Sequence, residues 1–187
     1  MKRSAVSGAT RGLIDASSAI LLYKAGLIDI FCRAVPLIMT RAVFEEVTVP
    51  QQAGAGELGE LANRQPGVVV LDDPRDQTTG AAAADIDRLD RGERDTLRHY
   101  LNGAARFVII DDGKAVRVCG RHAIPHVNAL LVPKLLLFSG HLSAGQTSHF
   151  FHDLCSLGRY SDRVVAWAHD CGAGQLDFFL LNIRRME

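Results

Sequence analysis

The chain has 187 residues, which is the usual length of one domain. Its 21 Lys and Arg residues balance its 21 Asp and Glu residues, so the formal net charge is zero. No field of the whole molecule therefore attracts nucleic acid, and a purely electrostatic nucleic-acid coat protein is excluded. A bound polyanion would need a local basic patch, and its binding would be sensitive to salt.

No segment has the composition of a secretion signal or a membrane span. The apolar stretch after the basic start contains Asp15 and Lys24, and this is too polar for a signal sequence. No run approaches the ~18 apolar residues of a membrane helix. The four cysteines form no CxxC pair, which argues against a zinc ribbon and a disulfide framework. We therefore expect a cytoplasmic protein that has no membrane partner.

Short apolar segments alternate with segments of helical pattern along the chain. After a flexible leader over residues 1–11, strands are predicted at 13–14, 36–39, 68–71, 107–110 and 124–127. Helices are predicted between them, at 16–26, 40–47, 54–64, 90–100 and 114–122. Residues 75–84 are predicted to form a loop, residues 128–171 to form helices broken at Gly140 and Gly158, and residues 178–183 stay unassigned. Because such alternation produces βαβ units, we predict an α/β fold whose parallel sheet is covered by helices on both faces.

Three of the predicted strands end in acidic residues. These are Asp15, the pair Asp72 and Asp73, and the pair Asp111 and Asp112. Ligands of parallel sheets bind at the carboxyl ends of the strands. Carboxylates gathered there repel one another and favour a hard cation such as Mg²⁺ or Mn²⁺. The alternative for each Asp is an ordinary turn or helix-cap role.

Two acidic residues on predicted helices have the same two interpretations. Glu46 lies beside Glu45 on the helix after the second strand, where a solvated surface charge is the alternative. Glu93 lies three residues after Asp90, the predicted first residue of its helix, and can complete a capping box there.

Taken together, these residues resemble the ordered acidic motifs of PIN-domain proteins. The motifs are Leu13-Ile14-Asp15-Ala16-Ser17, Val43-x-x-Glu46, Leu89-x-x-Gly92-Glu93 and Val108-Ile109-Ile110-Asp111-Asp112. The likeness is greatest to a prokaryotic branch related to the toxin ribonucleases of toxin–antitoxin pairs. It covers roughly residues 12–142, and the segment Gly158-Arg159-Tyr160-Ser161 is also similar to that branch.

The resemblance implies a three-layer PIN-like fold with a central parallel sheet over residues 12–142. A helical extension over residues 143–187 would pack on the same domain. The catalytic acids carried over from the family motifs are Asp15, Glu46, Glu93 and Asp112.

The resemblance also implies an acidic pocket that binds Mg²⁺ or Mn²⁺. Asp15 would be the central metal ligand, with Glu93 and Asp112 as further ligands. Asp111 is the alternative fourth acid and metal ligand, and Ser17 would hold a ligand or a metal-bound water. Asp72 and Asp73 match no motif and are expected to be turn residues.

A PIN-type pocket implies a metal-dependent ribonuclease that hydrolyses phosphodiester bonds of single-stranded RNA. Divalent ions held by carboxylates can activate the attacking water and stabilise charge on the phosphate and the leaving oxygen. The implied partners are an antitoxin protein and further copies of the same chain, in a homo-oligomer. One alternative is a catalytically weak PIN-fold module that binds nucleic acid or a protein partner. A phosphatase-like hydrolase with Asp15 as nucleophile is less favoured because position 17 is Ser rather than a second Asp.

A basic stripe is predicted beside Glu93. Arg91, Arg94 and Arg98 lie at helical spacing, where they could pair with RNA phosphates. The alternative is a solvated helix face whose charge is offset by Asp95.

Overall fold

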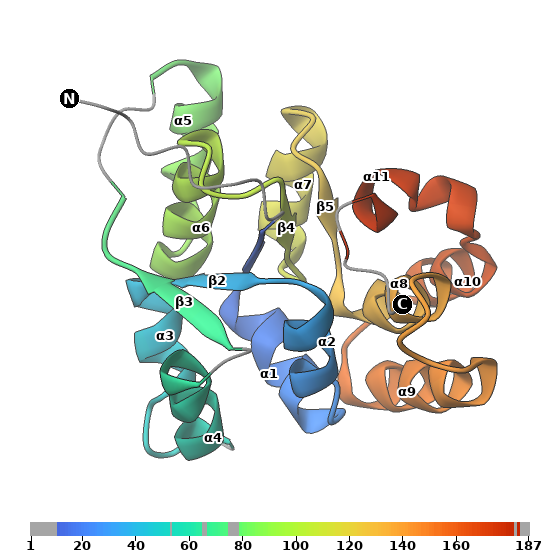
Figure 1. Ribbon diagram of the computed structural model, residues 1–187. Coiled ribbons are helices and arrows are strands. Elements are labelled where there is room, and N and C mark those ends of the chain that lie inside the picture. The colour runs from blue at the N-terminus through green and yellow to red at the C-terminus, as the bar shows by residue number, and fades with distance from the viewer. Residues whose placement is uncertain (1–10, 53, 65–66, 75–78, 182, 184–187) are drawn as a thin grey trace.

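The computed structural model of the protein describes residues 11–52, 54–64, 67–74, 79–181 and 183 (Figure 1). Most of the predicted leader, residues 1–10, lies outside this part of the chain.

The centre of the fold is a parallel sheet of five strands. They are β1 (Gly12–Ile14), β2 (Leu37–Thr40), β3 (Val68–Leu71), β4 (Phe107–Ile109) and β5 (His126–Val127), in the spatial order β3-β2-β1-β4-β5. Every neighbouring pair is parallel, which confirms the sheet predicted from the sequence. The chain adds β2 and β3 on one side of β1 and then β4 and β5 on the other. The carboxyl ends of β1 and β4 therefore form the switch point at which open parallel sheets bind ligands.

Helices cover both faces of the sheet, so the predicted three-layer α/β architecture is confirmed (Figure 1). One face is covered by α1 (Ala16–Lys24), α2 (Ile28–Ala34), α3 (Arg41–Val47), α4 (Ala55–Glu60) and the 3₁₀ helix η1 (Leu61–Asn63). The other face is covered by α5 (Ala81–Ile86), α6 (Arg91–Leu101) and α7 (Gly113–Arg121). Each face of the sheet has its own hydrophobic core: the first lies under α1–α4 and the second under α5–α7. Successive strand residues point to opposite faces, so Ile14 packs in the first core and Leu13 in the second.

The C-terminal helices join the first core. They are η2 (Ala129–Leu131), α8 (Val132–Phe138), α9 (Ala144–Leu157), α10 (Asp162–Asp170), η3 (Ala173–Gln175) and α11 (Asp177–Leu180). Leu154 of α9 and Ala168 of α10 are fully buried in that core. The ring of Phe179 packs edge-on against Phe107 of β4, with 5.4 Å between the ring centroids. The segment that had no assignment from its sequence thus contains a short helix with an aromatic anchor.

Polar caps explain where several helices begin. Asp15 accepts a hydrogen bond from the Ser18 N–H at the start of α1, and Thr40 accepts one from the Val43 N–H at the start of α3. Ser143 forms a capping box at the start of α9. The longest described helix, α9, has 14 residues, and in the described ranges no helix is long and apolar enough to cross a membrane.

One helix begins inside a predicted loop. The loop was expected over 75–84, but α5 starts at Ala81. Four consecutive alanines lie there, and alanine has the highest intrinsic helix propensity. Gly80, at φ 104°, supplies the turn into the helix.

The burial of α1 provides a test of the first core. Leu22 is completely buried, whereas Leu181 is 84% exposed. We expect Leu22→Ala to lower the free energy of unfolding by about 2–5 kcal/mol because it leaves a cavity. Leu181→Ala, the same change at an exposed site, should alter it by less than about 0.5 kcal/mol. Urea denaturation measures both values, and equal effects would contradict this packing.

Candidate functional site: an acidic cavity at the sheet edge

Asp15 links the central strand to the first helix. Its backbone N–H donates to the Ile109 carbonyl of β4 at 3.0 Å, which continues the sheet by one residue. Its side chain is only 1% exposed. Oδ1 accepts from the Ser18 N–H at 2.7 Å, and Oδ2 accepts from the Ser17 hydroxyl at 2.8 Å. Asp15 is thus the N-cap of α1 and also lies at the switch point of the sheet.

Asp111 joins three separate parts of the chain through its carboxylate. Oδ2 accepts from the Ser18 hydroxyl at 2.6 Å and from the Ala129 N–H of η2 at 2.9 Å. Oδ1 accepts from the Tyr160 hydroxyl, in the segment between α9 and α10, at 2.6 Å. The Asp111 N–H also lies 3.3 Å from Oδ2 of Asp15, to which it donates. Asp111 is therefore held by protein donors on both oxygens and in turn positions Asp15.

Asp112 is the N-cap of α7. Oδ1 accepts from the N–H groups of Lys114 and Ala115 at 2.8 and 3.0 Å. Oδ2 has no hydrogen-bond partner among the described residues, and Asp112 lines a cavity at this edge of the sheet. This oxygen is therefore available to a ligand.

Glu93 lies in the first turn of α6 with a buried oxygen. In the described part of the chain, its Oε2 has no hydrogen-bond partner. The side chain of Asp90 makes no hydrogen bond to the first turn, so the predicted alternative of a capping box does not form. A buried carboxylate oxygen without a donor is unfavourable unless a ligand compensates it.

Glu46 approaches α6 where that helix has a glycine. Its Oε2 lies 3.3 Å from the position that a Cβ atom on Gly92 would occupy. A side chain at position 92 would therefore crowd Glu46. Glu46 does not line the cavity, but its charge acts on Glu93.

The cavity has a volume of about 410 Å³. It is lined by Ser17, Ile20, Leu21, Glu93, Asp111, Asp112, Leu157, Gly158, Arg159 and Tyr160. Four of the residues singled out from the sequence thus share one cavity, namely Ser17, Glu93, Asp111 and Asp112. Asp15 does not line the cavity, but it is hydrogen-bonded to two residues that do, Ser17 and Asp111.

Burial and mutual repulsion raise the pKa values of the acids in this region. The pKa of Asp15 rises to about 7, mainly because the side chain is buried and then because of the charge of Asp111. Burial raises the pKa of Glu93, with smaller contributions from the charges of Asp112, Asp90 and Glu46. Burial also raises the pKa of Asp111 and, together with the charge of Asp90, that of Glu46. The region holds excess negative charge, which a cation would neutralise.

The chemistry of the donors fits a hard divalent cation. Glu93 offers a buried oxygen without a donor, and Asp112 offers Oδ2 beside it in the same cavity. Carboxylate oxygens are the ligands that Mg²⁺ and Mn²⁺ prefer. Within the described ranges, however, no three His, Cys, Asp or Glu side chains are grouped closely enough to hold a metal ion. Binding would therefore have to draw the carboxylates closer together.

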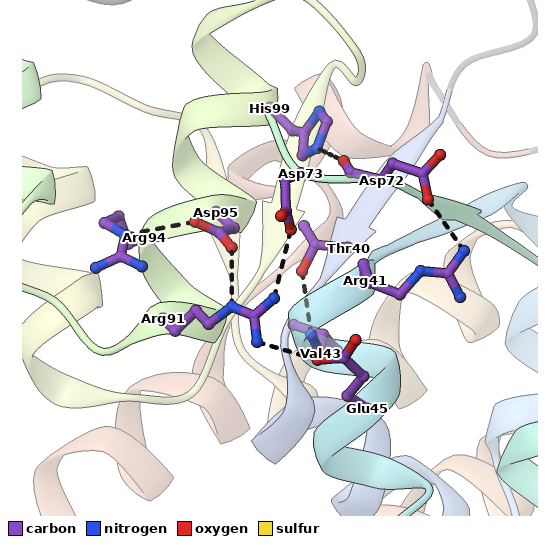
Figure 2. A network of polar contacts seen from close by, with 10 residues as sticks. All are labelled: Thr40, Arg41, Val43, Glu45, Asp72, Asp73, Arg91, Arg94, Asp95 and His99. Carbon is purple, nitrogen blue, oxygen red and sulfur yellow. Dashed lines mark hydrogen bonds and ion pairs between the residues drawn. The ribbon is translucent and has the colours of Figure 1, made fainter. Parts of the chain in front are cut away.

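The arginines of α6 form ion pairs with acidic residues outside the cavity, and Figure 2 shows those of Arg91 and Arg94. Their ion pairs are Arg91 with Glu45, Asp73 and Asp95 at 3.0, 3.4 and 3.8 Å, Arg94 with Asp95 at 3.4 Å, and Arg98 with Asp87 at 2.6 Å. None of the three lines the cavity. Their role in RNA binding stays a prediction.

Asp72 and Asp73 lie among these surface contacts rather than at the cavity. Asp72 pairs with Arg41 at 3.0 Å, and its backbone carbonyl accepts from His99 Nε2 at 2.8 Å (Figure 2). Both aspartates are exposed, as expected for turn residues.

Two parts of the site were not identified from the sequence. Ser18 has no predicted role in the site, although its hydroxyl, one position after that of Ser17, donates to Asp111 rather than to Asp15. Tyr160 belongs to a segment whose similarity to the PIN branch was noted without a role. Its proximity to Asp111, 49 residues away in the chain, follows only from the packing of α9 on α1 and η2.

The hydrogen bond between Tyr160 and Asp111 predicts a loss of stability in Tyr160→Phe. Removing a donor from a partly buried carboxylate should lower the free energy of unfolding by about 1.5–3 kcal/mol. Tyr100→Phe removes a hydroxyl that makes no hydrogen bond to the described residues and should change it by less than about 0.5 kcal/mol. Urea denaturation compares the two variants. An unaffected Tyr160→Phe protein would show that this hydrogen bond is not formed.

The raised pKa of Asp15 predicts that stability decreases with pH. The native pKa of about 7 lies above the ordinary value of 3.8, so between these values the native protein binds more protons than the unfolded chain. Stability should therefore fall as the pH rises from about 4 to about 7 in the absence of divalent ions. Asp15→Asn should reduce this decrease, so its stability relative to the wild type should rise by roughly 1–3 kcal/mol between pH 5 and pH 8. Denaturation at pH 5 and pH 8 measures the difference. A wild type that gains stability relative to Asp15→Asn over this range would contradict the raised pKa.

A comparison with known families places these motifs in context. A family model described as a PIN domain matches residues 12–164. No curated protein and no solved structure gave a match. The matched range runs from β1 into α10 and contains Asp15, Glu46, Glu93, Asp112 and Tyr160. Because the match covers most of the chain and the five-stranded parallel sheet agrees with it, this chain belongs to the PIN-domain family.

Proposed function

We propose that this PIN domain is a metal-dependent ribonuclease that uses Mg²⁺ or Mn²⁺. The family is one of nuclease-like folds. The observation that carries the proposal is the buried oxygen of Glu93, which lacks a donor among the described residues and belongs to a cavity that Asp112 also lines. Acidic groups that are buried together without basic partners are typical of a divalent metal site.

In this proposal Asp15, Glu93 and Asp112 hold the metal ion. When bound, a divalent ion supplies charge neutralisation at the phosphate and a water of lowered pKa. The Ser17 hydroxyl orients Asp15 through its 2.8 Å hydrogen bond. Asp111 acts as a positioning residue, because its oxygens accept from Ser18, Ala129 and Tyr160 while its N–H donates to Oδ2 of Asp15. Glu46 adds negative charge near Glu93 and so strengthens the attraction of a cation.

The finer features of the proposal rest on the likeness to the toxin ribonuclease branch. They are single-stranded RNA as the substrate, an antitoxin protein as a partner and assembly into a homo-oligomer. The proposal also keeps the cytoplasmic location expected from the composition of the sequence. Each of them can fail while the metal-dependent nuclease activity stands.

A catalytically weak binding module is the second candidate. It is favoured by the spacing of the acids, since no three possible ligands are grouped closely in the described part of the chain. Both oxygens of Asp15 also accept hydrogen bonds from serines. Under this proposal the protein would bind RNA or a partner without turnover.

The decisive variant is Asp15→Asn. We expect it to keep the fold and to lose Mn²⁺-dependent cleavage of single-stranded RNA by a factor on the order of 100 or more, as is typical when a metal ligand or its support is removed. Asp73→Asn, an exposed change away from the cavity, should cleave like the wild type. Gel analysis of a labelled oligonucleotide over a Mn²⁺ titration measures the rates. Wild-type cleavage by Asp15→Asn would refute the assignment of the site. A wild type that binds RNA but never cleaves it would establish the second candidate.

A further inference from the structure

The cavity has a second wall that the proposed metal chemistry does not use. Glu93 and Asp112 supply acidic groups, whereas Ile20 and Leu21 of α1 and Leu157 of α9 supply an apolar surface. The volume of about 410 Å³ is within the range of small-molecule sites, about 300–1,000 Å³. The cavity therefore has room for a ligand larger than a hydrated metal ion, with both an apolar and a charged part.

The segment Gly158–Tyr160 closes this wall in a defined position. A Cβ atom on Gly158 would lie 2.3 Å from Cε2 of Tyr160, so only glycine lets the Tyr160 ring fold back on the backbone. The Tyr160 hydroxyl is then fixed by Asp111 at 2.6 Å. Burial and the charge of Asp111 raise the pKa of Tyr160, so its hydroxyl stays protonated and remains a donor.

Arg159 is the basic residue that lines the cavity. Its side chain is exposed and forms no ion pair with the described residues. By contrast, Arg91, Arg94 and Arg98 are paired with aspartates and glutamates on and around α6. A guanidinium without an acidic partner, at the rim of a cavity, is suited to bind a phosphate.

We propose that this cavity binds one nucleotide of single-stranded RNA next to the bond that is cleaved. The base lies against Leu157, Ile20 and Leu21, and Arg159 binds a backbone phosphate. This inference rests on the proposed function, since it names the part of the RNA that the same site holds. A nucleotide matches the cavity because it combines a flat, weakly polar base with a negative charge at its edge.

The phosphate contact is tested by binding, in an Asp15→Asn background that does not cleave. Fluorescence anisotropy with a short labelled single-stranded RNA is recorded at several salt concentrations. Arg159→Ala should weaken binding about tenfold and make the slope of log K against log salt shallower by about 0.7, the effect of one lost phosphate contact. The matched control is Arg163→Ala, which removes an exposed arginine from the same C-terminal region but outside the cavity, and it should leave the slope unchanged. Unchanged binding by Arg159→Ala overturns the proposal, and a loss in Arg94→Ala instead would place the RNA on α6.

The base contact is tested with oligonucleotides that carry one abasic site at successive positions. An abasic site at one of these positions should weaken binding about tenfold, because the base that contacts the apolar wall is then missing. In Leu157→Ser that loss should shrink to less than about threefold, since the wall is already impaired. An abasic effect of the same size in both proteins overturns the proposal.

These outcomes are independent of turnover. If the wild type never cleaves RNA while the Arg159 and Leu157 effects appear, the nucleotide site stands and the ribonuclease function fails. If the wild type cleaves RNA and neither variant affects binding, only the nucleotide site is refuted.

Discussion

The structure depends on the burial of two carboxylates side by side at the point where the strand order reverses. Asp15 and Asp111 follow the neighbouring strands β1 and β4, and each is removed from most of the surrounding water. Ser18 donates to both of them, through its N–H to Asp15 and through its hydroxyl to Asp111. Because buried charges are unfavourable without donors, the starts of α1 and η2 must lie where they do to supply them.

This constraint also makes the C-terminal region part of the site. Tyr160 supplies the third donor to Asp111, and Gly158 allows its ring to adopt the required position. A residue that comes after the whole sheet therefore helps to position Asp15, which follows its first strand. The family match extends to residue 164 and therefore includes Gly158 and Tyr160.

Helix capping and a candidate catalytic role occur together at the same residues. The sequence left open whether Asp15 and Asp112 are helix caps or site residues. Both residues cap helices, and Asp112 also lines the cavity, whereas Asp15 contacts residues that line it. A cap uses some of the oxygens of a carboxylate, so the other oxygen can face a ligand, as Oδ2 of Asp112 does. The order of the acidic motifs thus predicted which residues form the site, but not which carboxylate oxygens accept hydrogen bonds from the protein. Those hydrogen bonds depend on donors such as Ala129 and Tyr160, which are distant in sequence from Asp111.

The sequence by itself determined the strands, most helix starts and the family, because apolar runs, caps and short motifs are local patterns. The prediction of a loop over residues 75–84 was wrong at its end, because the four alanines that begin α5 have a high helix propensity and follow residues typical of loops. Only the tertiary structure decided which charges remain available. The arginines of α6 form a basic stripe at helical spacing, but α3 and the end of β3 bring Glu45 and Asp73 to Arg91. Arg159 forms no ion pair with the described residues. The pairs of Arg91 with Glu45 and Asp73 join different elements, so they depend on tertiary packing and could not be predicted from the spacing within α6.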